Sequence, residues 1–281
     1  MTRARLTFLV ALVSVASRAA ALDSGSTGAL GALTPVADVT IPLPPDGVLN
    51  YTDVIVPAGV EVTFGRNARN TPVYLLATGD VVIEGTISVA APHPEPWAPT
   101  ERADVVGFGT PPGPGGFHGG SQFATGGGYG FGHAAGGPGV NDNCNGSAGG
   151  SAVSIGQQGY ANPLCPRPAS VNPPVSVFGW RLGHGGSGGA GSVYAVGGGG
   201  GGMLVVASGG TVRFGTPAGA PGWIVATGYA FGSSTTGVGG GGTVRIVADR
   251  VEGVGRVFVG FAAGDTSQCA GAAGISGFWN G

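Results

Sequence analysis

The chain has 281 residues, with 12 basic and 14 acidic side chains, no lysine and a formal net charge of −2. This balance gives no electrostatic support to nucleic-acid binding, and the 42% share of hydrophobic residues excludes disorder caused by high charge. Glycine supplies 61 residues, about three times its average share, while charged residues make up only 9% of the chain, so catalytic acids and bases are few.

Residues 1–21 have the pattern of a secretory signal peptide. Arg3 and Arg5 precede an apolar run at residues 6–15, and Ala19 and Ala21 supply the small residues of a cleavage site. The apolar run is too short to span a bilayer, which needs about 20 apolar residues, and no later segment is long enough either. We therefore expect secretion or display at the cell surface, with the periplasm as a further destination, and a mature chain that begins at Leu22.

Residues 22–53 are interpreted as a lead-in segment, and residues 54–281 as a single β-rich domain. Short runs of β-branched residues bounded by glycine, asparagine and aspartate are typical of strands. No window has a comparable apolar period of 3.6 residues, so little helix is expected. The predicted strands of the first part of the domain lie at residues 54–56, 60–64, 73–77, 81–83 and 86–89.

A strand–turn–strand pattern recurs along this domain. LLATGDVVIEGT at residues 75–86 is matched by VVASGGTVRFGT at residues 205–216, and a third copy lies at residues 246–255. Such a unit buries its apolar face only by stacking on neighbouring units, which predicts a short β-solenoid. A β-sandwich made of the same strands is the alternative fold. This alignment predicts two stacked positions. Leu76, Val206 and Val247 share one of them, and Val82, Val212 and Val251 share the other.

The string PAGVEVTFGRNARNTPVYLLATGDVVIEGTISV at residues 57–89 resembles the rungs of right-handed parallel β-helices of the pectin-lyase-like kind. The glycine-rich remainder resembles bacterial exported proteins in which such rungs alternate with glycine-rich tracts. The resemblance covers residues 54–89 and 202–259, less than half of the chain. It implies a right-handed parallel β-helix with long glycine-rich loops, and it transfers no functional residues.

Two glycine-rich insertions interrupt the domain at about residues 107–150 and 183–202, and the second ends in six consecutive glycines. Three interpretations are open, namely flexible linkers, loops that protrude from solenoid turns, and packed extended strands of the polyproline-II kind. The strict three-residue glycine period of collagen is missing. Aromatic residues in the first insertion argue against a mere spacer, so we favour loops that fold partly back over the solenoid.

Candidate chemical motifs are weak. The triplet around His184 matches one motif of the polygalacturonases, but the paired carboxylates that do acid and base work in such hydrolases are missing. The glycine run at residues 197–202 lacks the lysine and the helix of a phosphate-binding loop. No catalytic residue, cofactor or metal site is therefore assigned. Four carboxylates at or near equivalent turns could stack into a ladder that binds calcium, namely Asp80, Glu84, Asp249 and Glu252. Turns also prefer aspartate for backbone reasons alone, and we favour this second explanation.

Three cysteines occur, and export permits disulfides. Cys144 and Cys165 bracket a stretch rich in proline, asparagine and serine, so we predict a disulfide between them. Cys269 is then left over, and three free thiols are the alternative.

The sequence as a whole favours a non-enzymatic exported protein with a structural, adhesive or surface and matrix role. Polysaccharides and other cell-surface components are the candidate partners. One alternative is a degenerate or unrecognised carbohydrate-active β-helix, either a hydrolase or a lyase. A second is a carbohydrate-binding module, whose candidate aromatic residues are Trp97, Trp180, Trp223 and Trp279.

Overall fold

The computed structural model describes residues 22–92, 109–123, 126–132, 135–136, 185–189, 196–229 and 237–260. Within these ranges the protein is all-β and contains no helix, so no described helix is long and apolar enough to cross a membrane. Its strands form three parallel sheets and one short antiparallel pair, β8 (Gln122–Phe123) with β9 (Gly126–Gly127).

When the antiparallel pair β8 and β9 is left out, each of the three sheets takes every third strand of the described chain. The first sheet has the order β1-β4-β7-β12-β15, with β1 (Val39–Pro42), β4 (Glu61–Gly65), β7 (Thr86–Ser88), β12 (Gly222–Val225) and β15 (Gly255–Phe258). The second has the order β13-β10-β5-β2, with β2 (Val48–Tyr51), β5 (Val73–Ala77), β10 (Met203–Ser208) and β13 (Thr243–Val247). The third has the order β14-β11-β6-β3, with β3 (Val54–Val56), β6 (Val81–Ile83), β11 (Thr211–Phe214) and β14 (Arg250–Gly253).

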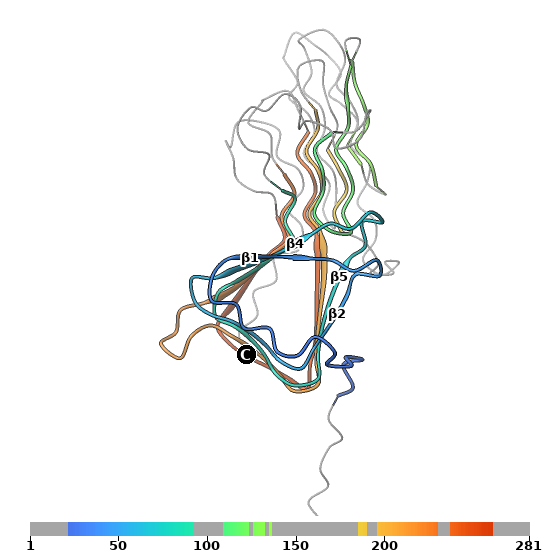
Figure 1. Cartoon of the computed structure of the whole chain (residues 1–281). Helices are drawn as coiled ribbons and strands as arrows, with labels where there is room; N and C mark the ends of the chain where they lie inside the picture. Colours follow the sequence, from blue (N-terminus) through green and yellow to red (C-terminus); the bar gives the residue numbers. More distant parts are fainter. Residues whose placement is uncertain are drawn as a thin grey trace, which may run out of the picture.

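The strand order is cyclic, since β2, β3 and β4 are followed by β5, β6 and β7, then by β10 to β12 and by β13 to β15. We call each such set of three strands a coil. Every coil pairs in parallel with the next, and the three sheets form the sides of a roughly triangular outline (Figure 1). This arrangement of stacked parallel strands is consistent with a parallel β-helix.

Apolar side chains fill the space between the three sheets. Within a strand, successive side chains point to opposite faces, and β5 shows the alternation of buried and half-buried residues that this produces. Equivalent inward residues stack from coil to coil, as do Val54, Val81 and Val212, which are all 0% exposed. Burying such a side chain stabilises the fold by roughly 1.5–3 kcal/mol. The stacked core therefore explains why short strands with few charges fold here.

The strand positions predicted from the sequence are confirmed, but the register of one repeat is wrong by one residue. Val206 pairs with Leu75 and Ile246, whereas Leu76 pairs with Ala207. In the neighbouring sheet Val212 pairs with Val81 rather than Val82. A slip of one residue turns every side chain to the other face, and the buried positions decide the true register, since Leu75 and Val206 are both 0% exposed.

The parallel sheets begin within the segment that the sequence analysis treats as a lead-in. Strands β1 and β2 lie there, and an isolated parallel bridge joins Leu33 to Val54 of β3. Prolines around these strands weaken their sequence signal. The segment is thus part of the stack: it supplies the first coil, at residues 30–42, and the first strand of the next coil.

The glycine-rich insertions leave the stack at a single corner. Residues 89–202 connect β7 to β10, and residues 226–242 connect β12 to β13, so both connections run from the first sheet to the second. Their described parts run side by side away from the triangular stack (Figure 1). They form packed extended strands, the third of the three interpretations, rather than the favoured loops that fold back over the sheets. We call these packed segments the glycine bundle.

Candidate functional site

The centre of the glycine bundle is a strand at residues 196–202, every residue of which is buried. Its N–H groups donate hydrogen bonds in a repeat of three residues: Gly197 and Gly200 donate to one neighbouring segment, and Gly198 and Gly201 to another. The acceptors are the carbonyls of Gly120 and Phe117 in the first segment, and those of Gly237 and Gly240 in the second. Three residues per turn is the geometry of a polyproline-II helix.

The carbonyl groups of this central strand accept hydrogen bonds in the same repeat. Gly198 and Gly201 accept from the N–H groups of Gly189 and Gly186, while Gly197 and Gly200 accept from Thr110 and Gly113. Five described segments surround the strand in this way, at residues 110–113, 117–120, 186–189, 226–229 and 237–240. Buried backbone polar groups must be paired, and here the pairing needs neither a helix nor a β-ladder.

Close packing explains why residues 198–202 of the central strand are all glycine. A Cβ atom added at Gly198, Gly199, Gly200, Gly201 or Gly202 would come within 3.0 Å of a neighbouring backbone atom, a distance that real Cβ atoms essentially never show. In collagen only every third residue faces the crowded axis, so glycine is needed at every third position. Residues 198–202 have neighbours on all sides, so glycine is needed at each of these positions and no three-residue glycine period arises.

The bundle also carries aromatic residues. Tyr129 is 66% exposed and Phe131 is 39% exposed, although most of the described glycines around them are buried. Flat rings at the edge of a rigid backbone assembly are surfaces on which other molecules can stack.

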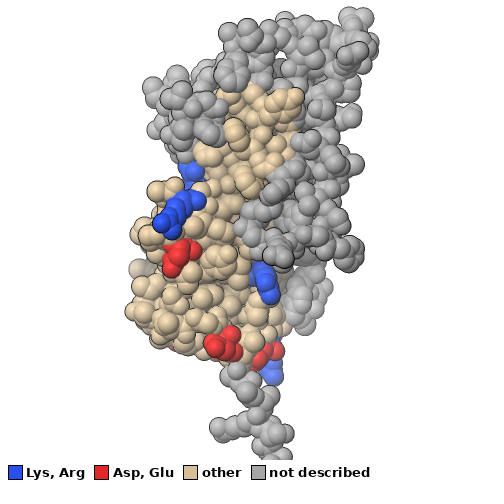
Figure 2. Space-filling view, turned by 90° about the vertical axis from the view of Figure 1, so that its right-hand side faces the viewer, with Lys and Arg blue, Asp and Glu red and all other residues tan. Residues whose placement is uncertain are grey.

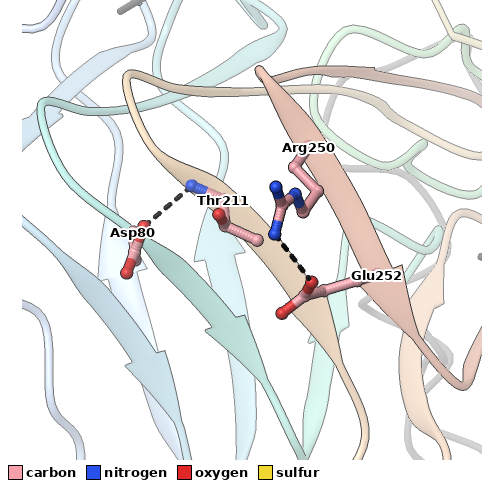
Figure 3. A network of polar contacts seen from close by, with 4 residues as sticks. All are labelled: Asp80, Thr211, Arg250 and Glu252. Atoms are coloured by element: carbon pink, nitrogen blue, oxygen red, sulfur yellow. Dashed lines mark hydrogen bonds and ion pairs between the residues drawn. The ribbon is translucent and has the colours of Figure 1, made fainter. Parts of the chain in front are cut away.

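Several carboxylates at the turns hold the backbone of the following coil. Oδ1 of Asp38 accepts a hydrogen bond from the N–H of Glu61 at 2.8 Å, and Oδ1 of Asp53 accepts one from Asp80 at 3.1 Å. Oδ1 of Asp80 in turn accepts one at 2.7 Å from the N–H of Thr211, which begins the neighbouring strand β11 (Figure 3). Such bonds to a charged acceptor are stronger than bonds between neutral groups. These aspartates therefore stabilise the joints between coils.

Asp53 and Asp80 form the closest match to a catalytic pair. They precede the paired residues Val54 and Val81, which places their backbones on neighbouring strands about 5 Å apart. Each carboxylate accepts a backbone hydrogen bond from the next coil, which is the structural role that turns usually give to aspartate.

The calcium-binding ladder does not form among the described residues. Asp80 aligns with Thr211 and Arg250, while Asp249 lies one position earlier in its turn. Glu252 pairs with Arg213 on the outer face of its sheet and lies 3.9 Å from Arg250, a contact between exposed side chains that contributes little (Figure 3). No group of three or more potential metal ligands occurs in the described part of the chain.

Charged side chains are few on the face shown in Figure 2, and acidic and basic residues lie near one another in small groups. One cation contacts an aromatic ring, since the guanidinium carbon of Arg256 lies 5.0 Å from the ring centroid of Trp223 on the neighbouring strand. Such a pair contributes about 0.5–1 kcal/mol at an exposed site. It places Trp223 on the outer face of the first sheet, while the other three tryptophans lie outside the described residues.

Other predicted features also lie outside the described residues. These features are the signal peptide at residues 1–21, His184, and the cysteines Cys144, Cys165 and Cys269. The predicted disulfide between Cys144 and Cys165 therefore stays a prediction.

Comparison of the chain with protein-family profiles, with curated proteins and with solved structures finds no match.

Proposed function

We propose that this chain is an exported, non-enzymatic protein with an adhesive or matrix role at the cell surface, built as a right-handed parallel β-helix. The three parallel sheets and their cyclic strand order support the β-helix. The right-handed form is expected because connections between parallel strands of one sheet are right-handed in about 98% of cases. The signal-peptide pattern at residues 1–21 supports export.

The observation that carries the structural role is the buried glycine strand at residues 196–202. This strand is hydrogen-bonded to segments from both glycine-rich insertions and from the connection between β12 and β13. Close backbone packing excludes side chains from residues 198–202 of the bundle. The bundle is suited to act as a stiff projection that presents the side chains at its edge, among them Tyr129 and Phe131.

The polar groups of the β-helix support the same proposal. The carboxylates of Asp38, Asp53 and Asp80 are used to bind backbone N–H groups between coils. A glycoside hydrolase needs two carboxyl groups that flank a bound sugar and are free to exchange protons with it. The described turn aspartates serve the fold instead.

The test has two arms on the purified exported protein. The first incubates it with a panel of soluble and insoluble polysaccharides and measures released reducing ends and unsaturated uronate products. We expect no turnover. The second measures retention of the protein on the insoluble members of the panel, and we expect retention that falls at least about tenfold when Tyr129 and Phe131 are both replaced by serine.

The competing hydrolase hypothesis has a clear outcome in the same assay. Turnover that is lost in both Asp53→Asn and Asp80→Asn, while their thermal melts stay within a few degrees of the wild type, would establish a catalytic pair and overturn the proposal. Retention that depends on Trp223 instead of the bundle aromatics would favour a carbohydrate-binding face on the first sheet.

A further inference from the structure

We infer that this protein binds a second copy of itself head to tail, with the last coil of one molecule stacked on the first coil of the next. The inference extends the proposed structural role by naming a partner, and it depends on the fold rather than on that role. It starts from the two ends of the stack.

At one end, β13, β14 and β15 are each the last strand of their sheet. Within the described residues each has a partner strand on one side only. A row of backbone groups without a partner strand is a template for pairing with another chain. The inward residues of this coil remain only partly buried, and they include Val251 and Val257.

At the other end, residues 30–42 form the first coil. Leu30 donates a hydrogen bond to the carbonyl of Asn50 at 2.8 Å, and Leu33 donates one to that of Asp53 at 2.9 Å. Strand β1 completes this coil by pairing with β4. Its inward residues Leu33 and Val39 are also only partly buried. Both ends therefore offer strand edges and apolar side chains.

The exposed apolar residues concentrate at these two ends. Seven large hydrophobic residues are exposed among the described residues, and four of them lie on the first or the last coil. These are Leu30 at 54%, Val36 at 96%, Val254 at 49% and Phe258 at 42% exposure. Exposed apolar surface of this kind indicates an interaction site when it is contiguous with unpaired strand edges.

The registers of the sheets match when one copy is placed on another. In the third sheet, one inward column runs from Leu33 through the paired valines to Val251. In the first sheet, another runs from Val39 to Val257. If a second copy continues the stack with the same register, its Leu33 meets Val251 and its Val39 meets Val257. Both contacts are apolar and face inward.

Charge complementarity selects this orientation. An outward column of the first sheet begins at Asp38, continues through Glu61, and ends at Arg256. Continuing the register therefore places Asp38 of the second copy against Arg256. The two halves of the stack differ in charge in the same sense, because residues 22–92 contain seven acidic and two basic side chains, while residues 203–260 contain four arginines and two acidic side chains. Complementary charges of this kind fix partner and register.

The contact joins two different surfaces, so it does not close on itself. A heterologous contact between identical molecules produces an open chain of copies. The product would be a filament in which the stacked sheets run continuously from one molecule to the next and the glycine bundles project sideways. This arrangement suits a protein of a surface layer or matrix.

The test is sedimentation velocity of the full exported protein over a range of concentrations, in the wild type and in Arg256→Asp and Asp38→Arg. We expect the wild type to form a concentration-dependent series of oligomers and each variant to associate at least about tenfold more weakly, because like charges then meet at the contact. Arg69→Asp carries the same charge change in an exposed loop away from both ends, so it should associate like the wild type.

Mixing the two end variants gives the sharpest result. Every contact between the two different variants pairs opposite charges, either Arg256 with Asp38 or the two introduced side chains, so an equimolar mixture of Arg256→Asp and Asp38→Arg should form oligomers although neither variant does so alone. The chain with both substitutions has its charges exchanged and should form oligomers again. A wild type that stays monomeric at every concentration overturns the inference, as do end variants that associate like the wild type. A monomeric wild type that still lacks turnover and still binds polysaccharide would leave the proposed function standing.

Discussion

The backbone nitrogen of Leu22 donates a 3.1 Å hydrogen bond to Oδ2 of Asp249, a residue 227 positions further along the chain. The contact joins the start of the described chain to the last coil. From there the N-terminal segment continues to Ser26, whose hydroxyl donates to the carbonyl of Tyr51 at 2.8 Å, and on to the first coil. Residues near the predicted cleavage site thus contact both ends of the stack.

Cleavage after Ala21 would convert this hydrogen bond into an ion pair. The nitrogen of Leu22 then becomes an ammonium group, and bonds between charged partners are stronger. We expect mass spectrometry of the exported protein to show an N-terminus at Leu22. In a double-mutant cycle, N-terminal acetylation and Asp249→Asn should couple by about 0.2–1 kcal/mol in thermal melts, less at high salt. A coupling energy of zero would mean that the pair does not form.

The corrected register makes a prediction about two adjacent leucines of β5. Leu75 is 0% exposed between the sheets, whereas Leu76 lies half-buried on the outer face. Leu75→Ala should lower the free energy of unfolding by about 2–5 kcal/mol, because it leaves a cavity in the core, and Leu76→Ala should cost less. Urea unfolding of the two variants provides the comparison. Equal losses, or a larger loss at Leu76, would restore the register first expected from the sequence.

The same register changes what is expected of Ser208. The alignment of residues 205–216 with residues 75–86 matches Ser208 to Thr78 of a turn, where a charge would be harmless, but in the structure Ser208 pairs with Ala77 and is 0% exposed. Its hydroxyl donates a 2.7 Å hydrogen bond to the carbonyl of Gly79. Ser208→Asp should therefore destabilise the fold by several kcal/mol, as Val206→Asp should, since both bury a charge without a partner. A nearly unchanged thermal melt for Ser208→Asp would contradict this assignment.

The strands were predictable because their signal is local. Alternating β-branched residues bounded by glycine and aspartate identify β3, β5 and β6 at the residues that the structure shows. Matching similar letters missed the register because it aligned residues 75–86 with residues 205–216, an offset of 130 positions. The structure pairs Leu75 with Val206 and Val81 with Val212, an offset of 131 positions in both sheets, so the whole copy is shifted by one residue.

The glycine bundle and the hydrogen bonds from turn aspartates to the next coil had weaker signals in the sequence. The bundle depends on hydrogen bonds between segments such as 117–120 and 196–202, which lie far apart in the sequence and have no apolar pattern to connect them. The turn aspartates do follow a sequence pattern, since Asp-Val occurs at residues 38–39, 53–54 and 80–81, at or just before a strand. A search for recurring strand-start aspartates would have found them.

Tyr51 should make the protein sensitive to alkaline pH. Burial raises the pKa of its phenol above the ordinary value of 10.0 because it disfavours the charged form. The folded state then holds the proton more tightly than the unfolded state, so this stability is present below about pH 10 and is lost as pH rises through the folded pKa. Tyr51→Phe should flatten the fall in melting temperature above about pH 10. Burial also raises the pKa of Tyr229, so Tyr229→Phe is measured in the same series. A fall in melting temperature above about pH 10 that stays unchanged when both tyrosines are replaced would contradict this role.

The glycine bundle can be tested by adding one methyl group at its centre. A Cβ at Gly200 would collide with the carbonyl oxygen of Gly186, which cannot move without disturbing the neighbouring segments, so Gly200→Ala should cost about 1–3 kcal/mol or more. Gly65, at the end of β4, is the matched control: it has no positive φ, and a Cβ there would have its nearest neighbours at 3.8 Å. Gly65→Ala should be neutral or slightly stabilising, because it restricts the unfolded chain. Guanidinium unfolding of both variants measures the difference. Equal stability would show that residues 196–202 do not pack as the central strand of the bundle.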